Sequence, residues 1–203
     1  MCAWSAKATR ERVAGLLWPD VPDRSARTNL RQVLWRLRSY GPDLVVGERL
    51  LTLSGQVQVD VTQSNLAALE GHDLERPAWA GELLAGKEFS DCPAFEEWLL
   101  FERERYWSLR RDALWRRCRA DQDAGELGSA LRHAARRLEL DPLSEPVYRL
   151  IMTLHAGGGD RAAALTAFRE CREVLREQLG VSPMPETLAL ADRIGRAGGA
   201  GEA

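Results

Sequence analysis

One predicted helix, over residues 24–39, gathers arginine and glutamine side chains on one face. At about 100° per residue, that face carries Thr28, Arg31, Gln32 and Trp35, and apolar residues lie on the opposite face. The forked groups of Arg and Gln suit base edges in a DNA major groove. Five arginines and one aspartate make residues 22–39 strongly basic. The pattern favours a nucleic-acid-binding helix, and a solvated amphipathic helix is the alternative.

Two kinds of DNA contact are expected if this helix enters a major groove. The candidates for base edges are Thr28, Arg31, Gln32 and Trp35. The candidates for phosphate contacts are Lys7, Arg10, Arg24, Arg27, Arg38 and Arg49. Trp35 is suited to packing on a sugar or a thymine methyl group. The alternative is that it is buried against a neighbouring domain or subunit. Arg49 is suited to contacting a phosphate or a minor groove. The alternative is an exposed arginine on a hairpin with no partner.

A helix-turn-helix is expected to position these side chains. Thr9 is a candidate N-cap for a first helix over residues 10–18, which the prolines of residues 19–22 end. Asp23 is the expected N-cap of the second, basic helix. A short helix, a tight turn and a second basic helix match the requirements of this motif.

A small β wing is expected after the second helix. Leu44–Val46 and Leu50–Leu53 read as two short strands around a turn at Gly47 and Glu48. Val57–Val61 alternates as a third strand should. The wing, over residues 44–61, would carry Arg49 near its tip.

The remainder of the chain is predicted to be helical. A short helix is expected over residues 62–70, and one long or two abutting helices over residues 95–119. The sequence Gly125–Leu131 recurs as Gly159–Leu165, offset by 34 residues. The helix pairs expected around these copies are 112–121 with 126–140 and 144–155 with 160–179, followed by a cap helix over 185–194. This period and layout are typical of tetratricopeptide (TPR) repeats.

Ordered motifs in both halves resemble one family of bacterial regulators. Leu16–Asp20 and Ser25–Gln32 resemble the winged-helix domain of antibiotic-regulatory-type (SARP) transcriptional activators. Glu96–Arg105, Leu138–Pro142 and Glu177–Pro183 resemble the bacterial transcriptional activator domain that follows it, a TPR-like array. The similarity covers about residues 7 to 194. It implies a mainly α protein with a DNA-binding domain over residues 1–61, an activator domain over 62–194 and a disordered tail over 195–203.

The resemblance also implies partners, and it implies that the winged domain lacks its N-terminal part. Family members bind repeated promoter sites in double-stranded DNA, often as dimers, and contact RNA polymerase, so a homodimer is one option here. The family's winged domain begins with a small sheet and a full first helix, whereas this chain resembles it only from the end of that helix. An N-terminally truncated winged helix-turn-helix is therefore expected. Ala26, Leu30, Val33 and Leu37 would then lack part of their covering.

Other functional classes find little support in the residues. The four cysteines and three histidines lack metal-ligand spacing, and neither a phosphate-binding loop nor a nucleophile elbow occurs. We therefore expect no catalytic site, metal or cofactor. Without a membrane-spanning run or a signal peptide, a cytoplasmic protein is expected. The alternative function is a TPR-type adaptor for protein–protein interaction whose truncated DNA-binding head is not functional.

Overall fold

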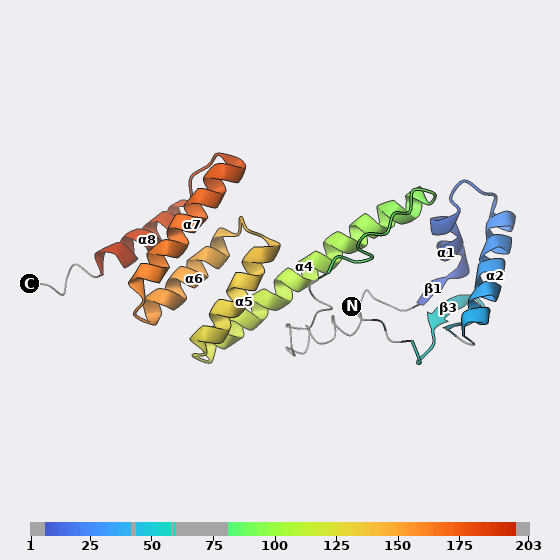
Figure 1. The fold of residues 1–203 in the computed structure, drawn as a ribbon, viewed down its shortest axis with the longest axis horizontal. Coiled ribbons are helices and arrows are strands. Elements are labelled where there is room, and N and C mark those ends of the chain that lie inside the picture. The colour runs from blue at the N-terminus through green and yellow to red at the C-terminus, as the bar shows by residue number, and fades with distance from the viewer. Residues whose placement is uncertain (1–6, 42–43, 58, 60–80, 198–203) are drawn as a thin grey trace, which may run out of the picture. The chain divides into compact units, whose positions relative to one another are not determined.

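The computed structural model describes residues 7–41, 44–57, 59 and 81–197. The chain divides into two compact units, Met1–Trp107 and Ser108–Ala203. Figure 1 shows the helices and strands of both units. The predicted helix over residues 62–70 lies outside the described residues.

The N-terminal unit opens with a helix-turn-helix and a small antiparallel sheet. Its elements are β1 (Lys7–Thr9), α1 (Arg10–Leu17), α2 (Asp23–Tyr40), β2 (Val45–Val46) and β3 (Leu50–Leu53). The strand order is β1-β3-β2, with Ala8 opposite Leu51 and Val46 opposite Thr52. The predicted pair of helices and the hairpin are confirmed.

The two predicted helix caps have different outcomes. The Thr9 hydroxyl accepts a hydrogen bond from the Arg12 amide at 3.2 Å, so the predicted cap of α1 is confirmed. The prediction for Asp23 is wrong, because α2 begins one residue earlier. Pro22 is its N-cap, and the Pro22 carbonyl accepts the Ala26 amide at 3.0 Å. Asp23 instead places a negative charge in the first turn, where it complements the helix dipole.

The core of this unit covers the apolar face of α2. Ala14 of α1, Ala26 and Leu30 of α2 and Leu51 of β3 form one buried cluster, in which Leu30 is 2% exposed. Burying such a leucine stabilises a fold by about 1.5–3 kcal/mol. The expectation that Ala26 and Leu30 lack covering is therefore wrong. Further along α2, Val33 and Leu37 are half-buried.

The third strand of the sheet comes from a different place than predicted. Val57 and Val59 are described, and neither lies in a strand; residues 58, 60 and 61 lie outside the described part. β1 pairs with one edge of β3, and β2 pairs with the other. The third strand of the sheet is therefore β1, which pairs with the edge of β3 opposite β2.

The N-terminal unit also contains the first half of a long helix, α4 (Pro93–Asp123). The segment before it is fixed to the helix by Arg103, whose Nε donates to the Leu83 carbonyl at 2.9 Å and pairs with Glu82 at 3.2 Å. Phe89 stacks edge-on against Phe95, with ring centroids 4.7 Å apart. The continuous helix confirms the pattern predicted for residues 95–119.

The C-terminal unit is a layered array of antiparallel helices. After the end of α4 come α5 (Leu127–Leu140), α6 (Glu145–Gly157), α7 (Arg161–Leu179) and α8 (Pro185–Arg196), as Figure 1 shows. The 34-residue repeat is visible in the packing. Ala130 of α5 and Ala164 of α7 are both fully buried, and the glycines at the preceding turns have φ of 78° (Gly125) and 84° (Gly159). Only glycine adopts such angles at low cost.

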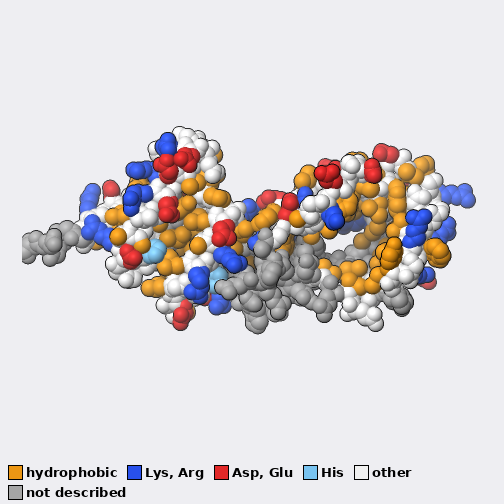
Figure 2. All heavy atoms as spheres, viewed as in Figure 1, with side chains coloured by type: hydrophobic (Ala, Val, Ile, Leu, Met, Phe, Trp, Pro, Cys, Tyr) orange, Lys and Arg blue, Asp and Glu red, His pale blue; other side chains and the backbone are white. Residues whose placement is uncertain are grey.

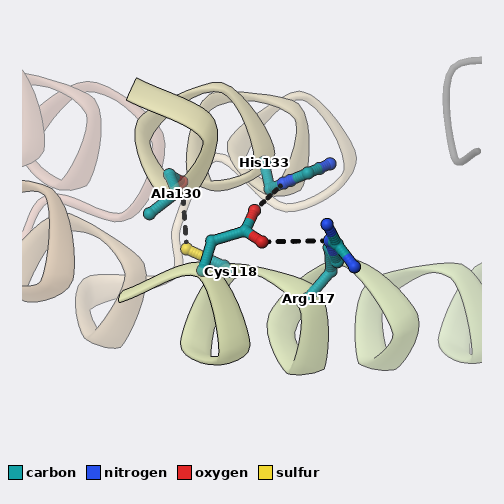
Figure 3. A network of polar contacts seen from close by, with 5 residues as sticks. Arg117, Cys118, Ala130 and His133 are labelled. Atoms are coloured by element: carbon teal, nitrogen blue, oxygen red, sulfur yellow. Dashed lines mark hydrogen bonds and ion pairs between the residues drawn. The ribbon is translucent and has the colours of Figure 1, made fainter. Parts of the chain in front are cut away.

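A polar network joins the end of α4 to α5 within this unit (Figure 3). The buried Asp121 carboxylate lies 3.0 Å from Arg117 Nε and 2.8 Å from His133 Nδ1. One turn away, the Cys118 thiol donates to the Ala130 carbonyl at 3.1 Å. Because Asp121 is 5% exposed, its contacts with Arg117 and His133 offset the cost of burying its charge.

The first two residues of the predicted disordered tail are helical. Gly195 and Arg196 belong to α8, which is anchored by the buried Ile194 and Ala191. Residues 198–203 lie outside the described residues. Across the described part of the chain, no helix is both long enough and apolar enough to cross a lipid bilayer.

Candidate nucleic-acid interface

The outward face of α2 brings the predicted base-contact residues together. Arg31, Gln32 and Trp35 are exposed, and Trp35 is 71% exposed. The face is directed outward because Ala26 and Leu30, on the opposite side, pack against α1 and β3. A tryptophan so exposed on a charged helix face loses apolar contact unless a partner covers it.

Thr28 is the least accessible of the predicted base-contact residues. It is half-buried, and its hydroxyl donates to the Arg24 carbonyl at 3.0 Å. Such back-bonding within a helix uses the hydroxyl proton and leaves the oxygen lone pairs as acceptors. In this arrangement Thr28 can accept a hydrogen bond or present its methyl group to a base.

Arginines of α2 form an exposed, positively charged surface. Arg24, Arg27, Arg31 and Arg38 are exposed, and none of them is in an ion pair with another described residue. Figure 2 shows Lys and Arg side chains gathered over α2. Asp23, Arg24, Arg27, Thr28 and Arg31 line a surface depression of about 540 Å³. Guanidinium groups in such a row can bind phosphate oxygens or the edges of guanine.

The hairpin turn of the wing depends on a glycine. Gly47 has φ of 105°, and a Cβ at this position would lie 2.0 Å from the Leu50 carbonyl oxygen. Arg49 follows in the same turn and is exposed, as predicted from its position in the hairpin. Its backbone carbonyl accepts the Arg10 amide at 3.2 Å, so the turn is fixed to the start of α1.

Arg10 has a structural contact that sequence reasoning missed. It is half-buried, and its guanidinium donates to the Glu48 carbonyl and, at 3.5 Å, to the Gly47 carbonyl. Arg10 thus holds the wing turn against α1. No sequence pattern indicates this contact, because the two partners of Arg10 are backbone carbonyls almost forty residues away. Lys7, another predicted phosphate contact, is exposed in β1, opposite Thr52.

Two exposed apolar side chains near this surface were also missed. Tyr40, the last residue of α2, is 85% exposed, and Leu50 is exposed at the start of β3. The neighbouring Leu51 is buried. Side chains alternate between the faces of a strand, but the run Leu50–Leu53 contains three leucines and hides this alternation.

A helix-turn-helix with a hairpin wing, together with a TPR-like array, defines the class of two-part bacterial transcriptional regulators. The chain belongs to the bacterial transcriptional activator domain family, whose family model matches residues 60–195, and it is a SARP-type regulator. This confirms the resemblance seen in the sequence.

Two curated relatives and one solved structure extend the comparison. The chain is 27% identical to the regulatory protein AfsR of Streptomyces griseus and 28% identical to AfsR of Streptomyces coelicolor, matching 94% and 92% of its own residues. It spans only about a fifth of their length, 21% and 20%. Its fold is similar to that of Mycobacterium tuberculosis EmbR, solved in complex with a low-affinity phosphopeptide. The TM-score is 0.57 and the identity 19%, covering 94% of this chain and 55% of EmbR.

Proposed function

We propose that the chain is a sequence-specific DNA-binding transcriptional regulator, an activator, that acts in the cytoplasm on promoter repeats. Residues 1–61 would form the DNA-binding domain and residues 62–194 the activator domain. The observation that carries this proposal is the row of exposed α2 arginines without ion-pair partners among the described residues. A surface of this kind has the charge and the side-chain geometry for a polyanionic duplex.

In the proposed complex, α2 lies in the major groove and reads base edges. Arg31 would bind the O6 and N7 atoms of guanine, and Gln32 would bind adenine. Trp35 would pack on a thymine methyl group or a sugar, and Thr28 would contact a neighbouring base. The exposure of Arg31, Gln32 and Trp35 on one face supports these roles.

The proposed phosphate contacts set the register of the complex. Arg24, Arg27 and Arg38 border the base-reading side chains on α2, and Lys7 and Arg49 lie on the sheet and the wing. Arg10 would act on the phosphate backbone together with the wing turn that it holds. The helical array would serve dimerisation or contact with RNA polymerase, as the family implies.

A fluorescence anisotropy titration with promoter DNA from the chain's own locus tests the proposal. The Arg31→Ala variant should lose about 1–3 kcal/mol of binding free energy and discriminate less between bases at one position. Arg36→Ala is the matched control, because Arg36 is an exposed arginine on the same helix but outside the proposed contacts. Equal losses for both variants, or equal affinity for unrelated DNA, would contradict base reading by Arg31.

The alternative function is an adaptor whose DNA-binding domain is not functional. In that case no variant should show salt-dependent DNA binding. The buried cluster of Ala14, Ala26, Leu30 and Leu51 supports a folded head and so favours the DNA-binding proposal.

A further inference from the structure

Two adjacent apolar side chains are exposed on α4 in the N-terminal unit. Leu100 is 63% exposed and Phe101 is 70% exposed, among the highest values for large apolar residues in the described part of the chain. Glu97 and Glu104 lie one turn before and one turn after them on the same face, and Glu97 is exposed. An apolar pair between two carboxylates is a small docking surface, which we call the α4 face.

The charge around the α4 face specifies what can dock on it. Residues 81–107 contain seven Asp and Glu residues and three Lys and Arg residues. A partner helix therefore needs an apolar side chain at its centre and positive charges one turn away on each side. Opposite charges placed in this way select a partner and its register.

The outward face of α2 meets this requirement within the same chain. Trp35 is exposed, with Arg31 four residues before it and Arg38 three residues after it. Phe101 likewise follows Glu97 by four residues and precedes Glu104 by three. Each charged pair therefore spans seven residues, about 10 Å along a helix axis. Aligned in parallel, the two faces put Trp35 on Phe101; aligned antiparallel, they put Trp35 on Leu100.

Within one chain the two faces do not cover each other, because Trp35 is 71% exposed and Phe101 is 70% exposed. We propose that α2 of one copy docks on the α4 face of a second copy. A two-fold dimer makes this contact twice, since each copy offers both surfaces. The dimer covers Trp35, Arg31 and Arg38, and it therefore excludes the duplex that the proposed function places on α2.

The contact itself does not depend on the proposed function; only its consequence, that self-association opposes DNA binding, rests on it. Sedimentation equilibrium of the full chain without DNA measures the contact directly. The chain should self-associate reversibly, and added NaCl should weaken the association because ion pairs at its margin are screened. Phe101→Ala and Trp35→Ala should each weaken it about thirtyfold or more, as for an aromatic anchor at an interface centre.

Mixing the two variants tests whether the contact forms between copies. Each variant alone has lost both copies of the contact, but the mixture retains one, between α2 of the Phe101→Ala chain and the α4 face of the Trp35→Ala chain. Association should therefore be stronger in the mixture than in either variant alone. Leu188→Ala is the matched control, because Leu188 is an exposed apolar residue on α8 of the other unit. It should leave self-association unchanged.

A charge exchange defines the orientation of the two helices. Glu97→Arg should weaken the dimer. Arg31→Glu should restore it in the same chain if the helices are parallel, and Arg38→Glu should restore it if they are antiparallel. A rescue by neither partner would mean that the α4 face does not bind α2.

The proposal is overturned if the chain stays monomeric at all concentrations tested. In that case the partner of the α4 face would be a basic helix of another protein. It is also overturned if Phe101→Ala has no effect or if Leu188→Ala abolishes association. DNA titrations test separately whether self-association opposes DNA binding. Phe101→Ala should bind DNA like the wild type at low protein concentration and more tightly where the wild type self-associates. Loss of DNA binding in every variant would refute the proposed function and leave the dimer contact standing.

Discussion

Two buried thiols predict that the helical array loses stability at alkaline pH. Burial, assisted by the nearby Asp121 carboxylate, raises the pKa of Cys118 from 9.0 to about 11. Burial and the Glu145 carboxylate likewise raise the pKa of Cys171 from 9.0 to about 11. The unfolded chain therefore releases each thiol proton at lower pH than the folded chain does. The stabilisation is complete below pH 9 and is lost as the pH rises toward 11.

The size of the loss follows from the two pKa values. A difference of two pKa units corresponds to about 2–3 kcal/mol for each thiol, of which roughly half is lost by about pH 10. Neither thiol is exposed, so little solvent screening reduces this effect. Because folded domains are stable by only about 5–15 kcal/mol, the loss should be measurable.

Urea unfolding followed by far-UV circular dichroism measures this effect between pH 8 and pH 11. Cys118→Ser is the informative variant, since a serine hydroxyl can still donate to the Ala130 carbonyl but does not ionise in this range. Below pH 9 the wild type should be the more stable protein. By pH 11 its free energy of unfolding should have fallen by about 2–3 kcal/mol relative to the variant. A difference that stays constant with pH would refute the reasoning, because Cys118 would then ionise equally in both states.

Three further predictions concern other contacts. Thr187→Val removes the hydroxyl that donates to the buried Glu145 carboxylate at 2.6 Å, and urea unfolding should show a loss of about 1–3 kcal/mol. Gly47→Ala places a Cβ 2.0 Å from the Leu50 carbonyl oxygen at a φ of 105°, so hydrogen exchange in β2 and β3 should accelerate while exchange in α5–α8 stays unchanged. Arg38→Ala should weaken DNA binding about equally for all sequences and reduce the slope of log K against log salt by about 1.

The helices were predictable because their packing leaves a periodic trace in the sequence. Leu30 and Ala26 are buried at the spacing that predicted the apolar face of α2, and Trp35 is exposed on the opposite face. The array was predictable for a second reason. Ala130 and Ala164 occupy equivalent buried positions 34 residues apart, and the small side chain is required at both.

The small sheet was less predictable because its stabilising contacts are not local. β1 has only three residues, too few for an alternating pattern, and it forms because Thr9 and Lys7 pair with β3. Arg10 was assigned to phosphate binding from its charge alone, and its contacts to the wing turn depend on that pairing. The site roles of Arg31, Gln32 and Trp35 stay predictions, since exposure on one face is required for base reading but does not establish it.

The contrast between the arginines of α2 and those of the helical array is an argument that α2 has a partner. In the array, Arg137 pairs with Asp141 at 3.2 Å, and Arg176 pairs with Glu173. On α2, Asp23 stands four residues before Arg27, a spacing that permits an ion pair, yet the structure contains none there. Surface ion pairs contribute only about 0–1 kcal/mol each, so α2 loses little stability by lacking them. The α2 arginines thus differ from those of the array in having no ion-pair partner among the described residues, and their surface remains available to a polyanion or to the α4 face.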